Sequence, residues 1–137
     1  KPHIAEVGRL GNSERLRSIQ RHQVETSPEL LIVRIDENLY FANSQYLENY
    51  IYDRIDPKSS VKHVIIVGSA INYIDFCGFE SLQRILEQLR DRDIQLHFAE
   101  FKGPVMDQLG KTNLLTQLLP GQVFMTASEA LRTLGHL

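Results

Sequence analysis

The sequence has a single cysteine, no tryptophan and no long hydrophobic run. One cysteine allows no internal disulfide, which favours a reducing compartment. No apolar stretch approaches the roughly 20 residues that a membrane-spanning helix requires. These absences exclude a disulfide-stapled scaffold and leave a globular domain as the simplest interpretation.

The familiar motifs of catalysis and nucleotide binding are also missing. There is no Gly-x-Gly-x-x-Gly fingerprint, no Gly-Lys-Ser/Thr phosphate loop and no Gly-x-Ser-x-Gly nucleophile elbow. None of the five histidines has the spacing of a metal ligand to another histidine or a carboxylate. We expect His63 and His97 to occupy edge or surface positions of strands. The sequence therefore predicts no metal, no cofactor and no enzyme, although Cys77 with a remote base stays open as a nucleophile.

The net charge of −2 gives no reason to expect a nucleic-acid partner, but the charges are unevenly distributed. Residues 1–22 carry five basic side chains against two acidic ones, whereas residues 29–56 carry six acidic side chains against two basic ones. We expect four arginines of the basic segment to be exposed on one side: Arg9, Arg15, Arg17 and Arg21. Positive charge is favoured beside a cytoplasmic membrane face. The segment is therefore either a membrane-facing surface or an ordinary solvated one.

The rest of the chain predicts one α/β domain. With 137 residues, of which 42% are hydrophobic, the chain is long enough to bury a single core. Segments 29–36 and 61–68 are nearly continuous apolar runs, which predicts two neighbouring central strands buried on both faces. Four of their side chains should lie in the core: Leu31, Val33, Val64 and Ile66.

Shorter patterns complete the secondary-structure prediction. Further strands are expected at 3–10, 23–26, 94–101 and 122–125, a polar loop at 11–18, and helices at 43–56, 78–92 and 102–119 and after Thr126. Asn43 or Ser44 should cap the first helix, Gly110 should interrupt the third, and Thr126 with Glu129 forms a capping-box signature. Because strands and helices alternate, we predict a mostly parallel sheet with right-handed crossovers.

The stretch "SAINYIDFCGFESL" (69–82) joins the second apolar strand to the helix after it. Backbone N–H groups are unpaired at a helix start, and Asp75 can accept one of them as the cap. Gly78 permits a close approach of a neighbouring chain segment. With the small Cys77 between them, the turn is either a plain strand-to-helix junction or a platform for a small side chain or a bound anion.

The order of elements around "VIIVGSAINYIDFCGFESL" resembles the STAS domain, which is shared by anti-anti-sigma factors and by the cytoplasmic tails of SulP-type anion transporters. The resemblance implies a mixed, mostly parallel sheet with helices mainly on one face, and it covers the chain as a single domain, residues 1–137. In the anti-anti-sigma branch the turn reads Asp-Ser-Ser-Gly, and a partner kinase phosphorylates the second Ser. Asp75 and Gly78 match this motif, whereas Phe76 and Cys77 depart from it. We therefore expect no phosphorylation switch at Cys77.

Three other segments resemble the transporter branch: "PHIAEVGRL" near the start, "YFAN" at residues 40–43, and "FKGPVMDQLGKTNLL" at residues 101–115. The resemblance implies the cytoplasmic domain of an inner-membrane transporter for sulfate or a related anion, and the opening Lys1-Pro2 fits a piece of such a longer protein. The transmembrane domain would then be the main partner. The resemblance also leaves open an acyl-carrier-protein-like regulator, a nucleotide and a dimer. The alternative is a free-standing anti-anti-sigma-like regulator that binds an anti-sigma kinase.

Overall fold

A computed structural model of the chain describes residues 4–9, 16–18 and 27–135. In these ranges six strands form one sheet, with the strand order β2-β1-β3-β4-β5-β6. The strands are β1 (Ile4–Arg9), β2 (Leu16–Ser18), β3 (Leu30–Ile35), β4 (His63–Val67), β5 (Gln95–Ala99) and β6 (Val123–Phe124). The strands β3 to β6 are parallel, whereas β1 is antiparallel to both β2 and β3.

The two apolar runs are the central strands β3 and β4, as predicted. They pair in parallel, with Leu31 beside Val64 and Val33 beside Ile66. None of these four side chains is more than 3% exposed. Side chains point alternately to the two faces of a strand, and both faces of this sheet are covered, which explains why the runs show no polar alternation.

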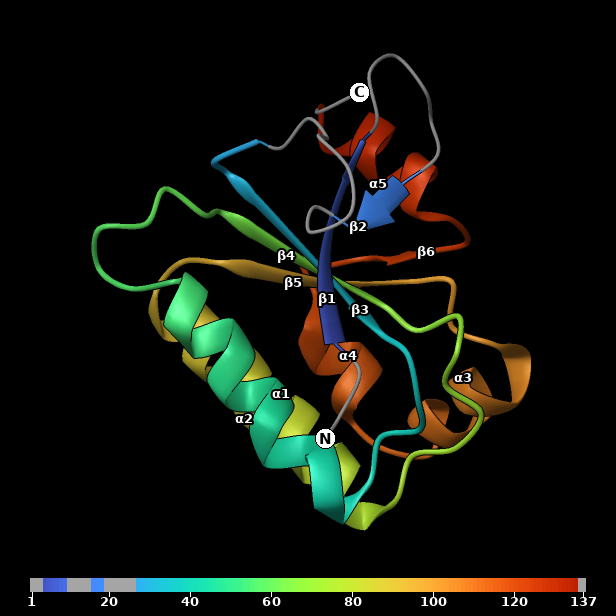
Figure 1. Cartoon of the computed structure of the whole chain (residues 1–137). Coiled ribbons are helices and arrows are strands. Elements are labelled where there is room, and N and C mark those ends of the chain that lie inside the picture. The colour runs from blue at the N-terminus through green and yellow to red at the C-terminus, as the bar shows by residue number, and fades with distance from the viewer. Residues whose placement is uncertain (1–3, 10–15, 19–26, 136–137) are drawn as a thin grey trace.

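The helices lie on both faces of the sheet but mainly on one (Figure 1). They are α1 (Phe41–Arg54), α2 (Phe76–Asp91), α3 (Gly103–Gly110), α4 (Leu114–Leu118) and α5 (Ala127–Thr133). Apolar side chains of α1 to α4 form one core cluster with one face of the sheet, and α5 packs against the other face. None of the helices in the described part of the chain is long and apolar enough to cross a membrane.

Some element boundaries differ from the prediction. Helix α1 begins at Phe41, with Tyr40 as its N-cap residue. Asn43 lies inside the first turn, where its Oδ1 accepts a hydrogen bond from the Tyr40 N–H at 3.0 Å. The predicted loop at 11–18 contains a strand, because residues 16–18 pair with β1. The segment predicted to be extended at 23–26 lies outside the described residues.

The expectation for two of the histidines was wrong. His97 is fully buried on β5, and His63 is half-buried on β4. Because Ile65 pairs with His97 and His63 with Gln95, both rings lie on the face of the sheet that α5 covers. The Nδ1 atom of His63 is 3.0 Å from the Nε2 atom of His97. Strand register brings the two rings together across 34 residues of sequence, which spacing along the chain cannot reveal.

Candidate functional site

The loops that follow β3 and β4 are tied together by their backbones. Leu39 and Ile74 form an isolated parallel bridge. The Leu39 N–H donates to the Tyr73 carbonyl oxygen at 3.2 Å, and the Asp75 N–H donates to the Leu39 carbonyl oxygen at 3.1 Å. Helices α1 and α2 therefore begin side by side at the carboxyl edge of the sheet, which is where open α/β folds commonly bind ligands and partners.

A side-chain contact reinforces the bridge. The Asn38 Oδ1 accepts hydrogen bonds from the N–H groups of Asn72, at 2.6 Å, and Tyr73, at 3.2 Å. Asparagine commonly stabilises turns by bonding backbone groups in this way. The Lys102 Nζ atom donates to the Asn72 Oδ1 at 2.6 Å, so the loop after β5 also joins the edge.

The predicted helix-start residues lie together at this edge. Asp75 is the N-cap of α2, and its Oδ1 accepts a hydrogen bond from the Gly78 N–H at 2.8 Å. A Cβ atom added to Gly78 would lie 2.7 Å from both the Leu39 carbonyl oxygen and the Ile74 Cγ2. The Asp75 cap and the Gly78 close approach are therefore confirmed, and both hold the helix start against the bridge.

Cys77 is half-buried in the first turn of α2. It occupies the position between the capping aspartate and the packed glycine, and it presents a thiol where a hydroxyl would be needed for phosphorylation. Within the described ranges, no group of three or more His, Cys, Asp or Glu residues is arranged to hold a metal ion.

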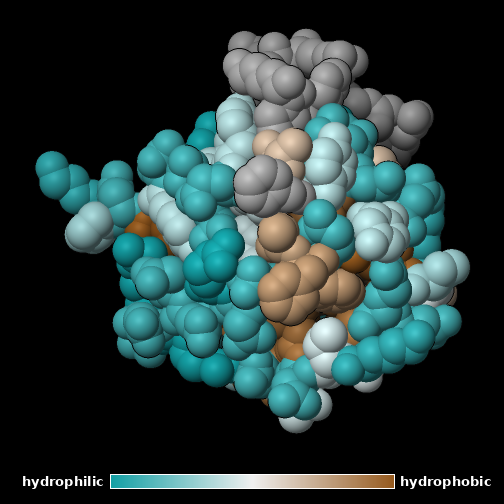
Figure 2. Space-filling model, turned by 90° about the horizontal axis from the view of Figure 1, so that it is seen from below, coloured by the Kyte–Doolittle hydropathy of each residue, from teal (hydrophilic) through white to brown (hydrophobic). Residues whose placement is uncertain are grey.

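Three aromatic side chains surround the bridge and are exposed to solvent. The exposed fractions are 40% for Tyr40, 53% for Tyr73 and 73% for Phe76, and we call these three residues the aromatic patch. Figure 2 looks at the molecule from the side where α1 and α2 begin, and an apolar area bordered by hydrophilic residues lies there. Exposed aromatic groups at such a place are typical of a protein-binding surface. Sequence reasoning missed the patch because an apolar periodicity does not tell exposed aromatic residues from buried ones.

A buried polar network holds α1 and α2 together behind the patch. The Glu48 side chain of α1 is only 4% exposed. It accepts hydrogen bonds from the Ser81 hydroxyl at 2.6 Å, from the Arg84 Nη2 at 2.8 Å and from the Tyr52 hydroxyl at 3.2 Å. Burial alone would raise the pKa of Glu48, but the bonds from Arg84, Ser81 and Tyr52 and the charge of Arg84 together lower it. Burial and the Glu48 charge raise the pKa of Tyr52.

The network also fixes the direction of the two helices. Ser81 contacts Ser44 and Glu48, and Arg84 contacts Glu48, so the partners follow one another in the same order along both helices. The helices are therefore parallel, and both N-terminal ends face the same edge of the sheet (Figure 1).

Arg9 and Arg17, the two described arginines of the basic segment, lie away from this site. Arg17 pairs with Gly8, and Arg9 pairs with Leu16, so both positions lie where β1 meets β2. The first residue of β1, Ile4, pairs with Ile35 at the carboxyl end of β3, so Arg9 lies at the opposite end of β1 from the helix starts. Arg15 and Arg21 lie outside the described residues.

Residues 21–130 match the family model of the STAS domain. The chain belongs to the STAS domain family. Its sequence is 31% identical over 140 residues to sulfate transporter 3.2 of Arabidopsis thaliana, an alignment that covers 95% of this chain and 22% of the transporter. It is 27% identical over 145 residues to high affinity sulfate transporter 2 of Stylosanthes hamata, covering 98% and 22% of the two chains. This STAS domain thus spans about a fifth of these relatives.

Two kinds of solved structure share the fold of this STAS domain. The murine Slc26a9 anion transporter in its inward-facing state superposes with a TM-score of 0.86, at 13% identity, over all of this chain and 23% of that one. A candidate anti-sigma factor antagonist from Thermotoga maritima superposes with a TM-score of 0.68, at 18% identity, over 80% of this chain and 90% of that one. At such identities these likenesses establish the fold alone.

Proposed function

We propose that this STAS domain is the cytoplasmic interaction and regulatory domain of a SulP-type inner-membrane transporter for sulfate or a related anion. The observation that carries the proposal is the pattern of coverage: nearly the whole chain aligns with sulfate transporters, but it accounts for only 22% of their length. The domain would act through contacts with the transmembrane domain, and not by carrying the anion or by catalysis.

The aromatic patch is the surface that we propose for this contact. Its side chains stand on a rigid base, because the bridge and the Glu48 network fix both helix starts. The position of Ile4 supports the same choice, since it pairs with Ile35 at the carboxyl edge of the sheet. A transmembrane domain that precedes this chain in a longer protein would therefore connect to it beside the patch.

A second contact surface follows from the four arginines. Arg9 and Arg17 lie at the far end of β1 from Ile4, so one flat contact cannot include both the patch and these arginines. Exposed arginines beside anionic lipid contribute about 1 kcal/mol each, and salt screens them. If the domain lies with β2 toward the membrane, we propose the basic segment as its lipid-facing surface. If the helix starts lie toward the membrane, we propose the patch as the surface that faces it.

The free-standing regulator remains the alternative, because an anti-sigma factor antagonist shares the fold. Cys77 argues against it, since the resemblance assigns phosphorylation in that branch to a hydroxyl at this position. We propose the same patch for any regulatory partner of the transporter, whether an acyl-carrier-protein-like protein, a nucleotide or a second copy of the domain.

Uptake of labelled sulfate by the full-length transporter in transport-deficient cells tests these proposals. Replacing Phe76 with Ser should reduce uptake at normal protein levels, because it removes the most exposed aromatic side chain of the patch. Met125→Ser is the matched control, since Met125 is 84% exposed after β6 and lies outside the patch. Normal uptake by Phe76→Ser with reduced uptake when all four arginines become Ser would reject the patch in favour of the basic segment. An open reading frame without upstream apolar segments would reject the transporter itself.

A further inference from the structure

His63 and His97 belong to a chain of hydrogen bonds that extends to Gln122, next to β6. The Gln122 N–H donates to the Nδ1 atom of His97 at 3.0 Å. This Nδ1 therefore carries no proton, and the proton of a neutral His97 must be on Nε2. Since the His97 Nε2 lies 3.0 Å from the Nδ1 of His63, the Nδ1 of His63 is the acceptor and its own proton is on Nε2. Gln122 thus donates to His97, and His97 donates to His63.

The two rings differ in their access to solvent. His97 is fully buried and packs against the Phe124 ring, with 5.7 Å between the ring centroids. Burial first, and then the charge of His63, lower the pKa of His97 to about 4. His63 is half-buried and lines a surface hollow of about 410 Å³. A proton that enters the pair from solvent therefore enters at His63.

Both signs of charge face His63 in this hollow. Lys62 and Arg92 line it as cations, and Asp93 lines it as an anion. The Lys62 Nζ also pairs with a carboxylate oxygen of Glu29, next to β3, at 3.1 Å. Gln95 of β5 and Phe124 of β6 add no charge, so the charges around His63 partly cancel.

We propose that the His63–His97–Gln122 chain is a pH-sensitive coupling that releases the connector between α4 and β6 when His63 gains a proton. A proton on the Nδ1 of His63 opposes the Nε2–H of His97 across 3.0 Å. The conflict is relieved if His97 moves its proton to Nδ1, but that proton then opposes the Gln122 N–H. The second arrangement keeps a charge-assisted bond from the Nδ1–H of His63 to the Nε2 of His97, so the bond that is lost is the one from the Gln122 N–H.

The connector is built so that Gln122 cannot adjust alone. A Cβ atom added to Gly121 would overlap the Leu96 carbonyl oxygen, so the connector lies directly on β5. The Gly121 N–H donates to the Leu118 carbonyl oxygen at 2.8 Å, and the Gln122 carbonyl oxygen accepts from the Phe98 N–H at 3.1 Å. Gln122 therefore cannot move away from His97 without also displacing Gly121 and the bond to Phe98.

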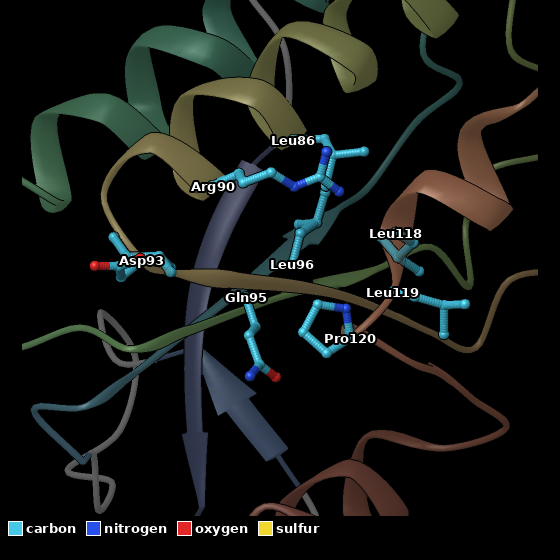
Figure 3. Close-up of a pocket in the computed structure, with 9 residues that line it drawn as sticks. Leu86, Arg90, Asp93, Gln95, Leu96, Leu118, Leu119 and Pro120 are labelled. Atoms are coloured by element: carbon cyan, nitrogen blue, oxygen red, sulfur yellow. The ribbon is translucent and has the colours of Figure 1, made fainter.

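The connector forms one wall of a pocket of about 310 Å³ (Figure 3). Leu118, Leu119 and Pro120 line it opposite Leu86 and Arg90 of α2. Leu119 is 66% exposed, so this wall already presents apolar surface. Protonation of His63 would widen the pocket and expose more of that surface.

Nuclear magnetic resonance of the 137-residue chain between about pH 8 and about pH 5 tests the coupling. Above neutral pH the ring nitrogen shifts of His97 should report a proton on Nε2 and none on Nδ1. The Gln122 amide should shift with the same midpoint as the His63 ring, and its protection against hydrogen exchange should fall about tenfold. The Ile51 amide, in the core on the opposite face of the sheet, is the internal reference and should not follow His63.

The variant His63→Gln has no titrating ring, so its Gln122 amide should be insensitive to pH over this range. A Gln122 response that persists in this variant overturns the proposal, as does a Gln122 amide that stays constant while His63 titrates. The wild-type spectrum decides even if the variant fails to fold, because a proton on the Nδ1 of His97 at about pH 8 contradicts the bond direction on which the coupling depends.

Discussion

The Ser81 hydroxyl of α2 lies 2.6 Å from the Glu48 Oε2 of α1, and this buried bond links the two helices that begin at the aromatic patch. Ser81→Ala should lower the free energy of unfolding by about 1–3 kcal/mol, because a buried carboxylate loses one of its donors. Urea denaturation measures the loss. Gln45→Ala, at an exposed position of α1, should change stability by less than about 0.5 kcal/mol. Equal effects of the two substitutions would contradict a structural role for the network.

The buried His97 should make stability depend on pH. Its pKa is about 4 in the fold, against an ordinary value of 6.5, because burial and then His63 disfavour the charged ring. The contribution of neutral His97 is therefore fully present above pH 6.5 and is lost as the pH falls from 6.5 toward 4. The total loss is about 3 kcal/mol. Urea denaturation at several pH values should give a steeper decline for the wild type than for His97→Gln, since the carboxylates contribute equally to both. Parallel declines would refute the prediction.

Gly78→Ala should destabilise the domain by about 1–3 kcal/mol, since the new methyl group would press against the backbone of Leu39. Gly110→Ala is the matched control. A Cβ atom there has no neighbour within 4 Å, so this substitution should be neutral or stabilise the domain by up to about 1 kcal/mol. Thermal unfolding of the two variants distinguishes these outcomes, and a neutral Gly78→Ala would mean that the two loops can separate.

Asp75→Ala should cost about 0.5–2 kcal/mol, because the Gly78 N–H loses its acceptor. Asp75→Asn keeps an oxygen that can accept the same bond, so it should retain most of the stability. Urea midpoints of both variants measure the difference. An Asn variant as unstable as the Ala variant would show that the charge of Asp75 matters and the cap does not.

Cys77→Ala should fold normally and support nearly normal anion uptake in the full-length transporter, because we assign the thiol a packing role. Mass spectrometry of the transporter from kinase-active cells should find no phosphate on residues 69–82. A transport defect with an intact fold, or a kinase-dependent phosphate in this segment, would contradict the packing role and show that the turn is a chemical switch.

Local patterns in the sequence predicted the fold well. Continuous apolar runs identified β3 and β4 as buried parallel strands. The alternation of strand and helix patterns along the chain identified the helical crossovers between strands. The Asp75 cap could also be predicted, because the preference of aspartate for a helix start acts within a few positions along the chain. Gly78 predicted a close approach of another segment, but not that the segment would be Leu39.

What could not be predicted depends on contacts between residues far apart in sequence. The bond from Ser81 to Glu48 spans 33 residues, and the one between His63 and His97 spans 34. Such pairs depend on strand register and helix direction, which only the assembled sheet fixes. Strand β2 was missed for the same reason, since its polar sequence carries no apolar period and only its pairing with β1 makes it a strand.

The bridge between Leu39 and Ile74 constrains the lengths of two loops more than their composition. Backbone hydrogen bonds do not depend on which side chains are present. The exposed residues beside the bridge can therefore change with the partner that they contact. One residue inserted between β3 and Leu39, or between β4 and Ile74, would break the bridge and rotate the start of α1 or α2 by about 100°. The turn at residues 56–61 leads toward β4 away from the bridge. Its bond from the Ser59 N–H to the Asp56 carbonyl oxygen lies within the turn, so it carries no such restriction. Variation among related domains should therefore appear as substitutions at the helix starts and as insertions at this turn.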